Sequence, residues 1–297
     1  MFPLNERQKR IIALIFLSFV FACMGLFARY LATGFFVFQQ VYLRMLAAFV
    51  IGFIVLRKQL NLRKIRRISS KDWGIIIFRA VSFAVFGVTL FTQAIVLTKY
   101  SNVSFISALP VTAVLGFLLL KEKFSLGKIL LVLLAFSGVV LIAVKDYTHL
   151  FIWGYGEILT LISTIFFSLG YVARKWQSKF LNNSELTVLN FLVAFLAVLF
   201  VSLIKGDGLP VAGWTSGLLM AIIGAGTFNV ANVFLINYGF EKVDAVLASN
   251  ILTLESFFAI LLGFLFYGEI PLVKELIGGA IIISSVIWMN QLKKRDE

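Results

Sequence analysis

The sequence predicts an all-α membrane protein of ten transmembrane helices, arranged as two inverted five-helix repeats with both termini in the cytoplasm. Composition, charge distribution and an internal repeat lead to this prediction. Of the 297 residues, 61% are hydrophobic and 14% are charged, and the mean hydropathy is +0.99. Soluble domains contain about 45–50% apolar and about 25% charged residues. The composition therefore excludes a water-soluble globular domain.

Apolar stretches of transmembrane length follow one another along the whole chain. A helix needs about 20 apolar residues to cross about 30 Å of hydrocarbon. Breaks at charged and Gly/Pro-rich segments leave ten such stretches, at 11–29, 38–56, 73–97, 102–120, 128–145, 154–173, 185–204, 213–238, 245–267 and 275–291. The first is too long for the apolar region of a signal peptide. We therefore expect it to be a retained transmembrane helix.

Basic residues are distributed unevenly between the two ends of these stretches. The chain has 27 Lys and Arg against 14 Asp and Glu, a net charge of +13 that in a soluble protein would suggest a nucleic-acid partner. With the N-terminus inside, 20 of the 27 fall on the cytoplasmic side, five lie at outer ends, and Arg44 and Arg79 lie within spans. The positive-inside rule then predicts a multi-pass protein of the cell (inner or plasma) membrane with both termini cytoplasmic. The lipid bilayer is the expected partner of these charges, and no nucleic-acid partner is expected.

A shift of 145 residues superimposes the first span on the sixth. Six identities fall in a sixteen-residue window: Leu14/Leu159, Ser18/Ser163, Phe21/Phe166, Gly25/Gly170, Ala28/Ala173 and Arg29/Arg174. This predicts two repeats, residues 1–147 and 148–297. Because each repeat has five spans, the two copies enter the membrane from opposite sides, as in many secondary transporters that work by alternating access. We expect one repeat to rock against the other.

Several short motifs resemble the EamA-type transporters of the drug/metabolite transporter superfamily. They are the Gly25 region, Val41–Ala48 with its Arg44, the stretch from Phe78 to Tyr100, Leu109-Pro110, and Leu120-Lys121-Glu122-Lys123 followed by Gly138, with Tyr267-Gly268-Glu269 as the counterpart in the second half. The resemblance implies a ten-helix carrier of small organic solutes. The stretch around Arg79 is most similar to the branch that includes S-adenosylmethionine carriers, whereas Glu255-Ser256 departs from a position where proline is common.

Glu255 is the one acidic residue that falls in the middle of a predicted span. Charges there are costly and usually face a cavity or a partner. Two hypotheses follow: Glu255 binds a cationic substrate group or carries a coupling proton, or it is a structural acid paired with a neighbouring helix. Asn250 and Thr253 lie near it on the same predicted helix and are further candidates for substrate binding.

Other polar and aromatic residues within the spans are weaker candidates. Asn229 and Asn232 share a helix face, and their amides suit zwitterionic solutes as well as helix–helix contacts. Gln93 and Ser107 are the polar counterparts in the first half.

Arg79 either binds an anionic group or extends its side chain to the membrane interface. The second alternative is favoured for both Arg79 and Arg44. Phe83, Phe167 and Tyr171 are the aromatic cavity candidates, and Pro110 is expected to kink its helix and act in gating.

The residue inventory argues against enzymes and bound metals. One cysteine (Cys23) and one histidine (His149) leave no thiolate cluster and little metal-site chemistry, and the sequence has no Walker, zincin or nucleophile-elbow motif. We expect no cofactor.

The predicted function is secondary transport of amino-acid-like or amphipathic metabolites, with export as the expected direction. The alternatives are uptake or exchange of S-adenosylmethionine-like or nucleotide-like solutes, a non-transporting membrane interaction subunit, and an intramembrane enzyme built around Glu255. Oligomeric state and proton coupling are left open.

Overall fold

The computed structural model describes residues 6–120, 126–143, 153–211, 213–242, 251–252 and 254–296. All elements assigned in these ranges are helical. In the first half they are α1 (Glu6–Leu31), α2 (Val37–Leu56), η1 (Arg57–Gln59), α3 (Leu62–Ile65), α4 (Ser70–Ala80), η2 (Val81–Val88), α5 (Thr89–Leu97), α6 (Tyr100–Ser107), α7 (Val111–Leu120) and α8 (Leu126–Ala143). In the second half they are α9 (Tyr155–Ala173), η3 (Arg174–Trp176), α10 (Asn183–Lys205), α11 (Ser216–Lys242), α13 (Leu254–Tyr267) and α14 (Val273–Asp296).

The apolar stretches of the sequence coincide with these helices. Within the described residues, six helical segments are long and apolar enough to cross a membrane: Lys9–Leu31, Val37–Gln59, Ser70–Leu97, Tyr155–Trp176, Asn183–Lys205 and Ser216–Gly239. Two shorter apolar helical stretches, Leu126–Ile142 and Leu254–Tyr267, fall in the predicted fifth and ninth spans. The structure is thus an all-helical bundle with multiple segments of membrane-spanning character.

Two predicted spans contain irregular backbone. The third is continuous from α4 to α5, but its middle eight residues, η2, form a π-helix. The fourth is not one kinked helix: it breaks into α6 and α7 at Ala108–Pro110. Pro110 has no N–H and cannot continue an α-helix through this point. The carbonyl of Ile106 instead accepts a tighter turn bond from the N–H of Leu109, at 3.1 Å.

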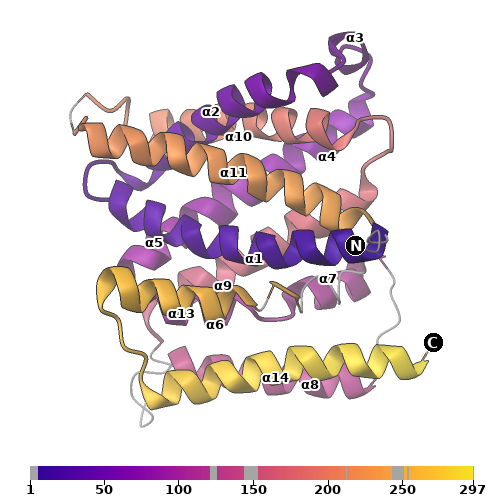
Figure 1. Ribbon diagram of the computed structural model, residues 1–297, viewed down its shortest axis with the longest axis vertical. Coiled ribbons are helices and arrows are strands. Elements are labelled where there is room, and N and C mark those ends of the chain that lie inside the picture. The colour runs from indigo at the N-terminus through magenta and orange to yellow at the C-terminus, as the bar shows by residue number, and fades with distance from the viewer. Residues whose placement is uncertain are drawn as a thin grey trace, which may run out of the picture.

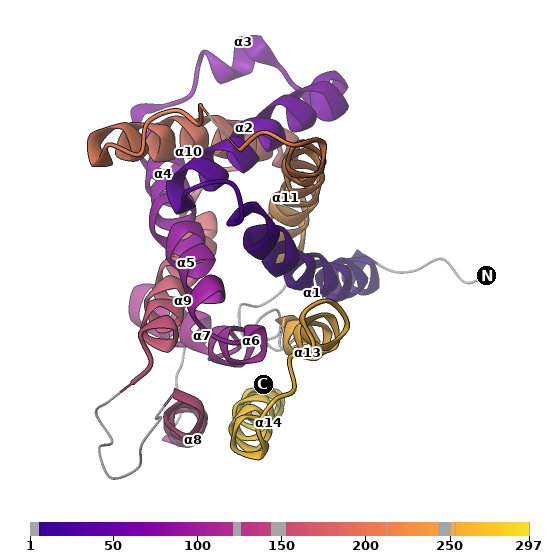
Figure 2. The same cartoon turned by 90° about the vertical axis from the view of Figure 1, so that its left-hand side faces the viewer.

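The two halves of the chain interleave instead of forming separate bodies. Figure 1 shows the long helices lying side by side, and the turned view in Figure 2 shows helices of both halves alternating around the centre. The main helix pairs join one half to the other: α2 packs on α10, α1 on α11, α5 on α9, and α8 on α14. The α8–α14 pair lies at one edge of the bundle in both views.

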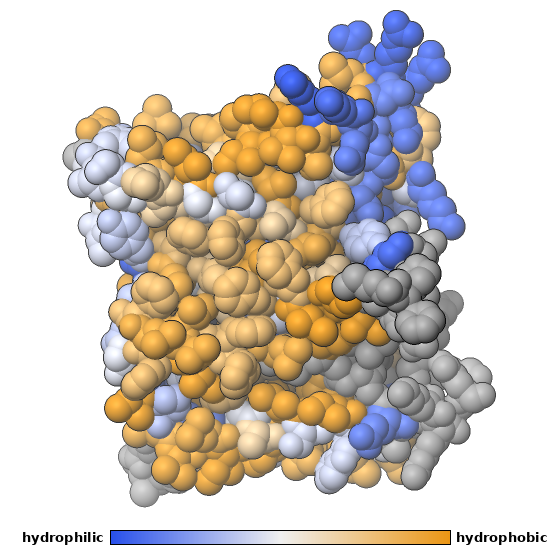
Figure 3. All heavy atoms as spheres, viewed as in Figure 1, coloured by the Kyte–Doolittle hydropathy of each residue, from blue (hydrophilic) through white to orange (hydrophobic). Residues whose placement is uncertain are grey.

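Polar residues gather at the ends of the bundle and apolar residues cover its side. Figure 3 shows an apolar surface across most of the face, with hydrophilic residues over α3 at the upper right and others along the left edge. Large apolar side chains such as Phe53, Phe200, Met220 and Phe264 are exposed on the bundle surface. The start of α1, the end of α14 and α3 all lie at the same end, which we call the basic end (Figure 1). The opposite end contains Arg29 and is called the Arg29 end.

The contact between α8 and α14 depends on two glycines that face each other. A Cβ atom on Gly138 would lie 2.6 Å from the carbonyl oxygen of Gly278, and one on Gly278 would lie 2.7 Å from that of Gly138. Small residues at such crossings allow two membrane helices to approach closely. This pair therefore sets the spacing of the two helices at the edge of the bundle.

The Gly138→Ala variant is expected to be less stable than the wild type. The added methyl group meets backbone that cannot rotate away, and overpacking of this kind costs about 1–3 kcal/mol. Denaturant unfolding in mixed micelles measures the difference. Gly74→Ala is the matched control, because a Cβ at Gly74 has nothing within 4 Å. Equal stabilities of the two variants would contradict the assigned role of Gly138.

Candidate functional site

A cavity lies in the middle of the bundle, between helices of both halves. Its volume is about 90 Å³, which is room for several water molecules or a small organic solute. Its wall is formed by Phe21, Met24, Arg44, Phe83, Val88, Phe91, Ser107, Ala108, Leu109, Thr112, Thr164, Phe167, Ser168, Tyr171, Asn229, Asn232, Leu252 and Glu255. Seven of the residues singled out from the sequence lie on this wall: Phe83, Ser107, Phe167, Tyr171, Asn229, Asn232 and Glu255.

Aromatic rings form one side of the central cavity. The ring of Phe167, from α9, lies 5.0 Å from that of Phe83 and 6.0 Å from that of Phe91. The ring of Tyr171, one helical turn beyond Phe167, lies 6.2 Å from that of Phe83. Phe83 is in the π-helix, and the irregular backbone there brings first-half rings against α9. The result is an apolar surface suited to the side chain of an amphipathic solute.

The polar groups in this cavity are few and incompletely hydrogen-bonded. The carboxylate of Glu255 makes no hydrogen bond or ion pair with the described residues. Asn229 and Asn232 are 4% and 3% exposed, and the Nδ2 atom of the first and the Oδ1 atom of the second are buried without a partner. Ser107 Oγ is also unpartnered. Buried polar groups are normally satisfied, so these atoms are hydrogen-bonding groups that the described residues leave available at the cavity.

Arg44 is the wall residue that sequence reasoning placed elsewhere. We expected its side chain to extend to the membrane interface, but it is 1% exposed and contributes to the cavity wall. Its Nη2 donates to Thr92 Oγ1 at 2.9 Å, and its Nε is buried without a partner. Thr92 directly precedes Gln93, a residue that was predicted to bind the substrate. Gln93 is half-buried and lies outside the cavity wall.

Arg79, whose side chain was also expected to extend to the membrane interface, is instead 6% exposed and lies in a second, smaller cavity nearer the basic end. This cavity shares Phe83 and Tyr171 with the central one. Arg79 donates to the carbonyl of Gly170 at 3.3 Å, to Gln177 Oε1 at 2.8 Å and to Asn237 Oδ1 at 3.0 Å. The guanidinium therefore connects the first-half helix α4 to second-half segments.

The remaining candidates are Pro110, Asn250 and Thr253. Pro110 ends the α6–α7 break beside the wall of the central cavity, whereas Asn250 and Thr253 lie outside the described residues.

A second network connects the halves at the Arg29 end. Arg29, from α1, forms an ion pair with Glu269, and also donates to the carbonyls of Ile95 and Thr98 at 2.6 Å each. The other carboxylate oxygen of Glu269 accepts from the backbone N–H of Tyr100 at 2.8 Å. The Arg29 and Glu269 side chains are only 15% and 16% exposed. These contacts tie α1, α5, α6 and the turn after α13 together.

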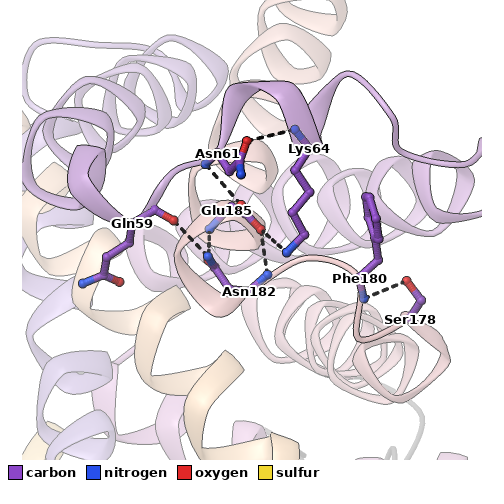
Figure 4. A network of polar contacts seen from close by, with 7 residues as sticks. All are labelled: Gln59, Asn61, Lys64, Ser178, Phe180, Asn182 and Glu185. Atoms are coloured by element: carbon purple, nitrogen blue, oxygen red, sulfur yellow. Dashed lines mark hydrogen bonds and ion pairs between the residues drawn. The ribbon is translucent and has the colours of Figure 1, made fainter.

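A third network lies at the basic end, between the α2–α3 segment and the start of α10 (Figure 4). Glu185 accepts from the N–H of Asn61, from Lys64 Nζ at 3.3 Å and from the N–H of Asn182 at 2.8 Å. Asn182 caps α10 by accepting from the N–H of Glu185, and donates to the carbonyl of Gln59. Each half is thus linked to the other at both ends of the bundle.

Metal-binding chemistry finds no support in the described part of the chain, where no three His, Cys, Asp or Glu side chains form a group able to hold an ion.

Comparison with known proteins identifies the family. The family model described as EamA-like transporter family matches residues 8–144 and again residues 154–291. The chain belongs to the EamA-like transporter family. It is therefore a multi-pass membrane protein of a family of small-solute transporters, with a two-repeat layout. No curated protein matches the chain. A solved structure described only as "Crystal structure of protein" has the same fold, with a TM-score of 0.69, 14% identity, and coverage of 97% of this chain and 98% of that one.

Removal of the charge from Glu269 is expected to destabilise the protein more than the same change at Glu275. Glu269→Gln leaves the mostly buried Arg29 guanidinium without its counter-charge, a loss of about 1.5–3 kcal/mol for a charged hydrogen bond. Glu275 pairs at 3.2 Å with Lys99, whose side chain is 35% exposed, so water can replace the lost partner of the ammonium group and the cost is about 1 kcal/mol or less. Denaturant unfolding of the two variants checks this ranking. A larger loss for Glu275→Gln would contradict it.

Proposed function

We propose that this EamA-like protein is a secondary transporter of small organic metabolites, amino-acid-like or amphipathic, and that it exports them. The central cavity is the observation on which the proposal depends. Its wall joins aromatic rings to a few unsatisfied polar groups, which is the composition of a site for a small amphipathic molecule. A non-transporting interaction subunit has no need for a cavity carboxylate such as that of Glu255, which no described residue pairs with or hydrogen-bonds.

The proposed topology has ten membrane crossings, two inverted repeats at 1–147 and 148–297, and both termini in the cytoplasm. Several features support it. The chain's basic residues concentrate in the segments assigned to the inside, and α3, the start of α1 and the end of α14 share one end of the bundle (Figure 1). In this arrangement the basic end faces the cytoplasm and the Arg29 end faces outward.

The proposed mechanism is alternating access to the central cavity. For a solute to leave at one end, the contacts between the halves at that end must break while those at the other end hold. The Arg29–Glu269 network and the Arg79 network occupy suitable positions on opposite sides of the cavity. Because the halves interleave, the moving units in this proposal are groups of helices from both halves, such as α2 with α10 and α5 with α9, and not one whole repeat against the other.

Glu255 is proposed to bind the cationic group of the solute and to exchange it for a proton. Each role requires a carboxylate that is reachable from the cavity and has no permanent partner. Glu255 lines the cavity, and none of the described residues pairs with it. Proton binding would then return the empty carrier to the other orientation, so a pH gradient would drive net transport.

Glu255→Gln is expected to abolish the dependence of flux on a pH gradient in proteoliposomes, with flux falling at least about tenfold, the effect of one charged hydrogen bond. The assay follows uptake of amino acids, nucleosides and sulfonium compounds with and without an imposed pH gradient. Asp207→Asn, the same chemical change outside the cavity, should behave as the wild type, and Glu255→Asp should retain some gradient dependence. Full gradient-driven flux in Glu255→Gln would show the proton-carrying role to be wrong. A preference for sulfonium compounds among the solutes would favour the S-adenosylmethionine-like alternative.

The topology predicts opposite labelling of two loops in intact cells. In a Cys23→Ser background, a cysteine at Arg63 in α3 should resist a membrane-impermeant maleimide until the membrane is permeabilised. A cysteine at Asp207, between α10 and α11, should react from outside. Labelling of both positions from the same side would refute the proposed orientation.

A further inference from the structure

The central cavity contains two opposite charges that do not pair with each other. Arg44 extends into its wall from α2 and Glu255 from α13, so the two charges come from different halves of the chain. Arg44 makes its one hydrogen bond among the described residues to the neutral Thr92 hydroxyl, and no ion pair joins it to any described acid. The cavity therefore has a cationic and an anionic region.

Arg44 is too deeply placed for its charge to be solvated at the membrane interface. It is the eighth residue of α2, is 1% exposed and is among the largest fully buried side chains of the protein. A buried guanidinium with five donors and one protein acceptor is costly, unless another acceptor reaches it. Its contribution to the cavity wall gives a ligand that access. A planar guanidinium matches a carboxylate through two parallel hydrogen bonds.

From this geometry we infer that Arg44 is the binding site for the carboxylate of the transported solute, and that the carrier selects zwitterions. The inference rests on the proposed transport function and adds the substrate class to it. A zwitterion places its carboxylate at Arg44 and its ammonium group at Glu255. Its side chain lies against the rings of Phe83, Phe91 and Phe167, while Asn229 and Asn232 supply the remaining hydrogen bonds.

The two charges together also explain which solutes are rejected. A simple anion satisfies Arg44 but meets the carboxylate of Glu255 in the same small cavity. A simple amine satisfies Glu255 but leaves the guanidinium without an acceptor. A site built to pair a charged group discriminates strongly against an analogue that lacks it, because the site's own buried group then remains unpaired. Each analogue with a single charge should therefore bind more weakly than the zwitterion.

The experiment compares matched triplets of solutes on the full-length protein in lipid nanodiscs. One triplet is phenylalanine, 2-phenylethylamine and 3-phenylpropionate, and the other is leucine, isoamylamine and 4-methylpentanoate. Dissociation constants are measured for the wild type, Arg44→Gln, Arg44→Lys and Arg63→Gln. The last variant is the matched control, because Arg63 is exposed in α3.

The wild type should bind at least one zwitterion about tenfold or more tightly than both of its analogues. Arg44→Gln should weaken binding of that zwitterion by a similar factor and leave binding of the amine unchanged, so that the preference disappears. Arg44→Lys should weaken the zwitterion less, because it keeps the charge and loses the planar fork. It also provides the test if Arg44→Gln does not fold. Arg63→Gln should match the wild type.

Three results would overturn the inference: equal binding of amine and zwitterion by the wild type, equal weakening of both by the Arg44 variants, or no binding of either zwitterion.

The proposed transport function is judged separately. If an uncharged nucleoside crosses the membrane with the Glu255 dependence described above, the carrier function stands and the zwitterion selectivity falls. If no solute crosses in a protein-dependent manner, the carrier function itself falls.

Discussion

The cost of isolated charge in a low-dielectric interior governs the centre of this protein. An ionised side chain among membrane helices persists where it faces a partner or a cavity. Arg79 has three acceptors and Arg29 has a carboxylate and two carbonyls, so their charges are compensated by the fold. Among the described residues, Arg44 and Glu255 have no partner of opposite charge, and the two share one cavity. The difference separates charges that the fold compensates from charges that face the cavity, and the proposed binding site is built on the second kind.

Irregular backbone surrounds the same cavity. The π-helix η2 contributes Phe83 and Val88, and the break between α6 and α7 contributes Ala108 and Leu109. Non-helical backbone at membrane depth is tolerated where it is buried in protein or faces a cavity, and π-helical turns are frequent at functional sites. On either side of η2, α4 packs on α10 while α5 packs on α9. The irregular segment, which itself contacts both α9 and α10, thus lies where the third span passes from one of these helices to the other.

Sequence reasoning identified the helices and much of the cavity wall because both depend on local chemistry. Apolar length placed the spans, and i, i+3 spacing put Asn229 and Asn232 on one face, where both line the cavity. Other features depend on contacts between distant segments. Gln93 was predicted as the first-half counterpart of these asparagines, but Arg44 donates its hydrogen bond to the neighbouring Thr92, and Gln93 lies outside the wall. Whether Arg44 points to lipid or inward is decided by the packing of α2 on α10 and α11, which no local pattern encodes.

A structure of the protein determined with saturating phenylalanine or leucine tests the central claim most directly. The account predicts that the solute occupies the central cavity, with its carboxylate oxygens within hydrogen-bonding distance of the Arg44 guanidinium and its ammonium group beside Glu255. Solute bound outside this cavity would contradict the account. So would solute in the cavity with its carboxylate turned away from Arg44.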